Sequence, residues 1–171
     1  MEYTEQQSIF RAKLALFKNF DEAFELVRSA VFSRFNLRRA GLTLVLQVMP
    51  ANLGAYHPLG SNAIVLNRYL LAVIKENTKS LEIYNAYLFM VLAHEYLHSL
   101  GIVDENIVRQ MTYDLCKSTL GEDHSSTRMA KEDPLSLFPE LKSLLHTQCQ
   151  GFGKEFEVVR NFDRTNQSYI Q

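Results

Sequence analysis

The chain has 171 residues, of which 47% are hydrophobic, so it is long enough to fold as one domain with a substantial core. Its 18 lysines and arginines nearly balance its 19 aspartates and glutamates, and the formal net charge is -1. This balance argues against a nucleic-acid partner, because proteins that bind nucleic acids usually carry a strongly basic surface. Two cysteines are too few for a disulfide framework and favour a reducing, cytoplasmic setting.

The sequence also gives no sign of export or of membrane insertion. Residues 1–7 (MEYTEQQ) are polar and acidic, whereas a signal peptide begins with a basic segment that an apolar one follows. In the middle of the chain, the longest stretch without charged residues runs from Ile83 to His94. That stretch is shorter than the roughly 18 residues a spanning helix needs. We therefore expect a cytoplasmic protein with no membrane partner.

The first half of the chain alternates between helix and strand patterns. Apolar residues at helical spacing from Glu5 to Phe35 predict one broken helix or two, with Asp21 as the cap of the second after a break at Asn19-Phe20. Leu42 to Met49 and Ala63 to Leu66 are short apolar runs of the kind that forms strands. Helical periodicity returns directly after the second of these runs.

A central helix is predicted next, from Ser80 to about Leu100. Ser80 is a suitable N-cap, and Gly101 is a suitable residue at which the helix can end. The segment from Ala86 to Ala93 is apolar on nearly every side. This pattern predicts a helix that its neighbours cover all round.

The second half of the chain is predicted to be mainly helical. Asp104 is the expected N-cap of a helix that ends near Leu120, and short helices are expected near Ser126 to Glu132 and Phe138 to His146. A short strand from Phe156 to Val159 is expected within an otherwise irregular tail.

The residues that carry chemistry are concentrated in one motif of the central helix, HEYLH at positions 94–98. Because a helix turns by about 100° per residue, His94 and His98 lie about 40° apart on one face, and both imidazoles can reach one metal ion. Glu95 points about 100° away from His94, outside the ligand set but near the water that a metal activates, where a general base acts. The alternative is a pair of core histidines with ordinary hydrogen bonds.

This motif resembles that of the zincin metallopeptidases. Residues 94–104 read HEYLHSLGIVD, which matches H-E-x-x-H-x-x-G-x-x-D, a metzincin-like spacing with Asp where the third His usually stands. The segment from Gly54 to Asn67 lies where zincins place an edge strand above the cleft. The resemblance extends roughly from Leu42 to Asp133, and the whole chain is similar to small single-domain predicted metallopeptidases of prokaryotes, more often of archaea.

The resemblance implies an α+β, zincin-like fold, in which a small mixed or antiparallel sheet packs on helices and the motif lies on the central helix. We expect one such domain over residues 1–150 and a partly ordered C-terminal tail over residues 151–171. The implied function is zinc-dependent hydrolysis of a peptide or protein substrate, with one Zn²⁺ per chain and Glu95 as general base. The alternative is a zincin-fold metal-binding or protein-interaction module with little or no activity.

A catalytic zinc site needs a third protein ligand besides the two histidines, and the sequence offers three candidates. His124 is our first choice, because it follows the next helix, as the third histidine does in SprT-like zincins, and because imidazole is a common zinc ligand. Asp104 lies at the metzincin-like distance but is equally suited to capping the next helix. Glu105 would be a ligand of the gluzincin type, with a spacing that is unusually short for that class.

Two further residues are candidates for substrate binding. Tyr56 and His57 immediately precede the expected edge strand. Either side chain could donate a hydrogen bond to the oxyanion that forms during peptide hydrolysis. The alternative is that both are ordinary residues of a surface loop.

Overall fold

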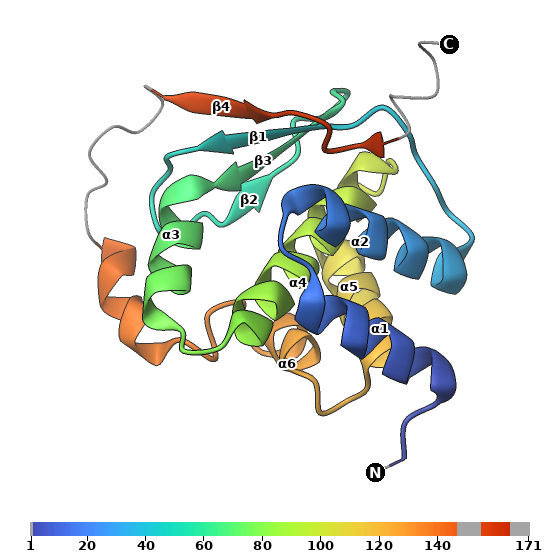
Figure 1. Ribbon diagram of the computed structural model, residues 1–171. Helices are drawn as coiled ribbons and strands as arrows, with labels where there is room; N and C mark the ends of the chain where they lie inside the picture. Colours follow the sequence, from blue (N-terminus) through green and yellow to red (C-terminus); the bar gives the residue numbers. More distant parts are fainter. Residues whose placement is uncertain (1, 147–154, 165–171) are drawn as a thin grey trace.

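The computed structural model describes residues 2–146 and 155–164 and has an α+β architecture, with a small sheet along one side of a group of helices (Figure 1). In chain order the elements are α1 (Glu5–Leu16), α2 (Phe20–Phe35), β1 (Thr43–Gln47), β2 (Ala55–Tyr56), β3 (Ala63–Asn67), α3 (Arg68–Asn77), α4 (Leu81–Ser99), α5 (Glu105–Leu120), α6 (Ser125–Lys131), the 3₁₀ helix η1 (Pro139–His146) and β4 (Phe156–Val159). Across residues 2–146 and 155–164, no helix is both long and apolar enough to cross a membrane.

The sheet is mixed, with the strand order β2-β3-β1-β4. The central pair β1 and β3 is parallel, whereas β2 pairs antiparallel with β3 and β4 pairs antiparallel with β1. A mixed sheet was one of the two arrangements expected from the sequence. The strand β4 comes from the segment expected to be a C-terminal tail, so the sheet includes residues on both sides of the boundary drawn at residue 150.

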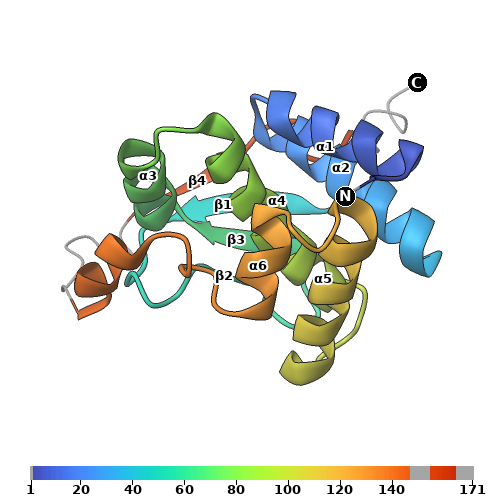
Figure 2. The same ribbon diagram turned by 90° about the horizontal axis from the view of Figure 1, so that it is seen from below.

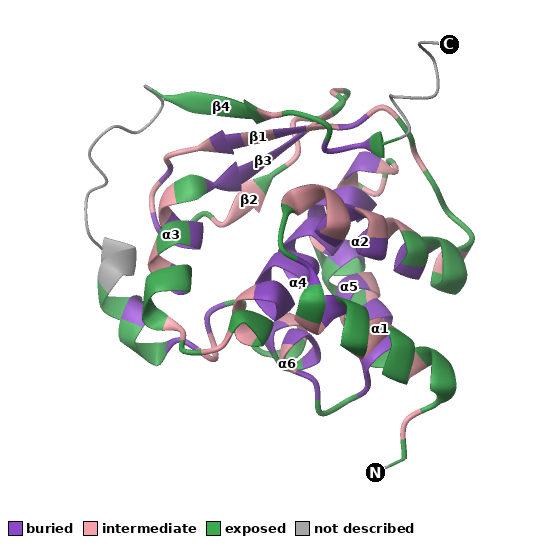
Figure 3. Ribbon diagram, viewed as in Figure 1, coloured by how far each residue is buried: buried purple, intermediate pink, exposed green. Residues whose placement is uncertain are grey.

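The helix α4 is the centre of the molecule, as its apolar composition predicts. It contacts α1, α2, α3, α5 and α6 as well as the strands β2 and β3. Figure 2 shows these elements grouped around it, and Figure 3 shows that most of its length is buried. The helix begins after Ser80 and ends just before Gly101, whose φ of 97° is accessible mainly to glycine. These ends place the His94–His98 segment in its last two turns.

The break between α1 and α2 lies where it was expected, but a different residue caps the second helix. Asn19 is the N-cap of α2, and its side chain accepts a hydrogen bond from the backbone N–H of Glu22 at 2.9 Å. Asp21, the expected cap, lies within the first turn of the helix. Asparagine and aspartate are about equally good N-caps, so composition alone could not separate the two positions.

A single buried asparagine organises the chain between β1 and β2. Asn67, the last residue of β3, is fully buried and also caps α3. Its amide donates to three backbone carbonyls, and its Oδ1 accepts from three backbone N–H groups. The carbonyls belong to Met49, Pro50 and Leu53, and the N–H groups to Met49, Tyr69 and Leu70. Asn67 therefore holds the 49–54 loop in place.

Candidate metal centre

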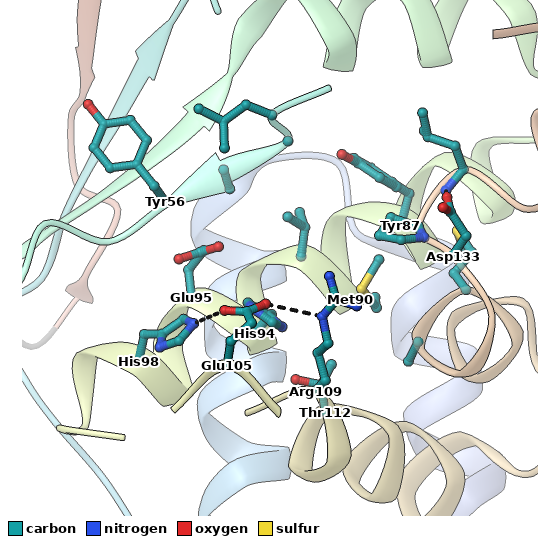
Figure 4. Close-up of a pocket in the computed structure, with 18 of the residues that line it drawn as sticks. Tyr56, Tyr87, Met90, His94, Glu95, His98, Glu105, Arg109, Thr112 and Asp133 are labelled. Atoms are coloured by element: carbon teal, nitrogen blue, oxygen red, sulfur yellow. Dashed lines mark hydrogen bonds and ion pairs between the residues drawn. The ribbon is translucent and has the colours of Figure 1, made fainter. Parts of the chain in front are cut away.

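The end of α4 and the start of α5 bring three potential metal ligands together. After α4 ends, the chain turns at Gly101, and α5 begins at Glu105. The carboxylate of Glu105 then faces the imidazoles of His94 and His98 (Figure 4). One nitrogen or oxygen atom of each side chain lies within 4.8 Å of the others. We call His94, His98 and Glu105 the ligand group.

Two of the three separations within the ligand group are close to those of a metal site. His94 Nε2 lies 3.1 Å from Glu105 Oε1, and His98 Nε2 lies 3.0 Å from Glu105 Oε2. Two ligands in a tetrahedral zinc site, each 2.0–2.1 Å from the metal, are separated by about 3.3 Å. The two contacts are close to that separation, and all three ligand atoms lie within 4.8 Å of one another.

The hydrogen bonding of His98 determines which of its nitrogens is available to a metal. His98 Nδ1 lies 2.8 Å from the carbonyl oxygen of Ile102, which can only accept a hydrogen bond, so Nδ1 carries a proton. In the neutral imidazole, Nε2 then has a free electron pair directed at Glu105. Electron pairs of an imidazole and a carboxylate repel one another unless a proton or a cation lies between them. This arrangement, with a backbone carbonyl fixing the tautomer, is typical of histidines that bind metals.

Burial and charge affect the ligand group in opposite directions. Burial lowers the pKa of His94, although the carboxylate of Glu105 opposes this effect. For Glu105, burial acts to raise the pKa, but the combined attraction of His94, Arg109 and His98 exceeds it, and the pKa is lowered overall. The lowered pKa of Glu105 favours its ionised form, which is the form in which a carboxylate binds a metal.

Glu105 is the least favoured of the three sequence candidates for the third ligand, and it is the one that joins the two histidines. Asp104 instead caps α5, because its Oδ1 accepts from the backbone N–H groups of Asn106 and Ile107 at 2.9 and 3.0 Å. Within residues 2–146 and 155–164, the ligand group is the only cluster of three or more such side chains, and it contains neither Asp104 nor His124.

His124, our first choice, lies at the other end of α5. The 16 residues of this helix extend over about 24 Å, with Glu105 at one end and Gly121 next to the other. His124 is buried there as the N-cap of α6, and its Nδ1 accepts from the backbone N–H of Ser126 at 3.2 Å. Burial lowers the pKa of His124 to about 4. The turn after α5 therefore leaves His124 away from the motif.

Glu95 lies beside the ligand group without joining it (Figure 4). Glu95 is 5% exposed, and no residue of the described ranges forms a hydrogen bond or ion pair with its side chain. Burial, with a contribution from the charge of Glu105, raises the pKa of Glu95 to about 8. A divalent cation bound to the ligand group would act in the opposite direction and lower the pKa of Glu95. A buried carboxylate that no structural partner explains is a candidate for a catalytic role.

The ligand group opens into a cleft of about 1130 Å³. The floor of this cleft is the face of α4 that carries both histidines and, two turns earlier, Tyr87. One wall consists of the 51–57 segment, which includes β2, and the opposite wall is a face of α5. The segment from Met129 to Leu135 closes the far end, where Tyr87 and Asp133 lie (Figure 4). The cleft is therefore polar near the ligand group, and its far end combines apolar side chains with the charged Lys131, Glu132 and Asp133.

Tyr56 and His57 both line the cleft, but neither is directed at the ligand group by its contacts. Tyr56 pairs with Val65 in the sheet, and its hydroxyl donates to Gln47 Oε1 at 3.2 Å, pointing away from the ligand group (Figure 4). His57 Nδ1 lies 2.7 Å from the carbonyl oxygen of Ala63. Strand alternation explains the direction of the Tyr56 side chain. Ala55, which pairs with Leu66, packs against the core, so the next residue, Tyr56, faces the other side of the sheet.

Arg109 is a residue of the site that the sequence reasoning missed. It lies on α5 one turn after Glu105, and its Nε donates to Glu105 Oε1 at 3.2 Å. The i, i+4 spacing of opposite charges was a signal available in the sequence. It had no functional meaning until Glu105 was placed beside the histidines.

Comparisons with known proteins add no assignment to this geometry. No protein-family model matches the chain, and neither a curated protein nor a solved structure matches it.

Proposed function

We propose that this protein is a zinc-dependent peptidase with a zincin-like active site. The observation that carries the proposal is the ligand group, two histidines one helical turn apart joined by Glu105, with the buried carboxylate of Glu95 beside it in an open cleft. Three protein ligands are the number found in catalytic zinc sites, which keep the fourth position for water or substrate. The mixture of imidazole and carboxylate donors is one that zinc commonly accepts.

A peptide substrate is supported by the strand next to the cleft. The strand β2 lies at the edge of the sheet and pairs with β3 on one side only among the described strands. An extended peptide can add to such an edge through backbone hydrogen bonds, which do not depend on its side chains. The same segment forms a wall of the cleft, so a peptide bound along it would pass the ligand group.

The reaction adds one water across a peptide bond. The water oxygen bonds to the carbonyl carbon, the carbon–nitrogen bond breaks, and a carboxylic acid and an amine are released, which then ionise to a carboxylate and an ammonium group. A zinc ion held by the ligand group would polarise the carbonyl and lower the pKa of the attacking water. Glu95 takes a proton from that water and delivers it to the leaving nitrogen, so the side chain ends in its starting state. No covalent intermediate with the protein is required.

The experiment that tests this function is digestion of a mixture of unstructured peptides by the purified protein, followed by mass spectrometry. We expect internal cleavage products, their loss after treatment with 1,10-phenanthroline, and their return when zinc is restored to the chelated protein. A metal-loaded protein that cleaves no peptide would contradict the proposal and support the metal-binding module instead. Cleavage that survives removal of the metal would contradict the zinc mechanism.

A further inference from the structure

The guanidinium group of Arg109 lies at the reacting end of the cleft. Its Nε donates to Glu105 Oε1, the same oxygen that contacts His94 Nε2 at 3.1 Å. Figure 4 shows the guanidinium extending into the cleft from α5, between Glu105 and Met90. Because a guanidinium is planar and rigid, fixing Nε also fixes the direction of its two amino groups.

The N–H groups of these two amino groups are available to donate hydrogen bonds. A guanidinium carries five N–H groups, and the bond to Glu105 uses one of them. No acceptor for the others is present among residues 2–146 and 155–164, and the side chain is 71% exposed. Lys131, which also lines the cleft, differs in that its ammonium group pairs with Glu122 at 3.5 Å. Arg109 thus presents unused positive charge directly beside the ligand group.

The proposed reaction needs a donor at that position. When water attacks a peptide carbonyl, negative charge develops on the carbonyl oxygen, and preorganised donors that bind this oxygen lower the barrier. The two residues that the sequence suggested for this role are occupied elsewhere, Tyr56 with Gln47 and His57 with Ala63. Resting on the function proposed above, we propose that Arg109 is a catalytic residue that donates to the scissile carbonyl oxygen and stabilises its developing charge.

The first test is the kinetics of Arg109→Ala and Arg109→Lys on a peptide that the wild type cleaves. We expect Arg109→Ala to lower kcat by about 10²–10³-fold, as removal of one oxyanion donor does, with KM changed by less than about threefold. Arg109→Lys keeps the charge but lacks the planar pair of donors, so we expect a partial loss. Arg128→Ala is the matched control, since it removes an exposed arginine that does not line the cleft, and we expect its kcat to be unchanged.

The second test measures binding without turnover. A phosphinic peptide carries an anionic, tetrahedral group in place of the scissile amide. Calorimetry gives its Kd and, in the Glu95→Gln variant, which does not turn substrate over, the Kd of the uncleaved peptide. Adding Arg109→Ala should weaken binding of the phosphinic peptide by about 10²-fold and binding of the uncleaved peptide by less than about threefold. The reason is that only the phosphinic peptide resembles the transition state.

Three outcomes would overturn this assignment. A kcat of Arg109→Ala within about threefold of the wild-type value would show that Arg109 does not touch the reacting oxygen. Equal weakening of both peptides would show ordinary substrate binding. Loss of zinc from Arg109→Ala, with activity restored at high zinc, would show that Arg109 acts only by positioning Glu105. A wild-type protein that cleaves nothing would instead overturn the proposed function, so the two failures are distinguishable.

Discussion

Replacing Glu95 with glutamine is expected to lower kcat for peptide hydrolysis by about 10²–10⁴-fold while bound zinc is retained. An amide has the size of the carboxylate but cannot accept a proton from the attacking water, so the general-base contribution is lost. Glu95 lies outside the ligand group, and the zinc content should therefore stay at the wild-type value. The measurement is kcat on a cleaved peptide together with the zinc content of the same sample.

Glu132→Gln is the matched control for this variant. Glu132 also lines the cleft, but it is exposed at the end away from the ligand group, where the same chemical change should leave kcat within about twofold. If Glu95→Gln keeps most of the wild-type activity, Glu95 is not the base. If that variant loses zinc, its carboxylate belongs to the metal site and the assignment of roles is incorrect.

Replacing Asn67 with alanine is expected to lower the free energy of unfolding by about 3–5 kcal/mol. The side chain is fully buried and hydrogen-bonds to six backbone groups, four in the 49–54 loop and two at the start of α3. Each buried group left without a partner costs about 1–3 kcal/mol. The expected loss is smaller than the sum of the costs for all six groups, because the loop can open and let water hydrogen-bond to some of them. Urea unfolding, followed by circular dichroism, measures the change.

A second asparagine in the same helix region provides the comparison. Asn77 lies at the opposite end of α3, is exposed, and makes one side-chain hydrogen bond, to the carbonyl of Val73. Asn77→Ala should change the free energy of unfolding by less than about 1 kcal/mol. A loss below about 1 kcal/mol for Asn67→Ala would mean that the loop is held by other contacts.

The helix boundaries around the site could be predicted from sequence because local chemistry determines them. Ser80, Gly101 and Asp104 occupy the terminal positions that were expected, and α4 is buried all round as its apolar composition indicated. Capping and hydrophobic periodicity act over a few residues, so a single sequence contains the information they require. The two histidines followed directly from the position of the motif on this helix.

The third member of the ligand group could not be predicted because it depends on the path of the chain between two helices. The turn over residues 100–104 is short enough to place the first residue of α5 against the last two turns of α4. The same turn leaves Asp104 as a cap and leaves His124 a helix length away. Likewise, Tyr56 lines the cleft, but the direction of its hydroxyl depends on the register of β2 with β3.

The central claim is that His94, His98 and Glu105 hold one zinc ion, and metal analysis tests it most directly. The measurement is atoms of zinc per chain, by elemental analysis, for protein dialysed against micromolar zinc and then desalted. We expect about one zinc per chain in the wild type and in His124→Ala, and a content near zero in Glu105→Ala. No bound zinc in the wild type, or zinc lost from His124→Ala but retained by Glu105→Ala, would contradict this account of the site.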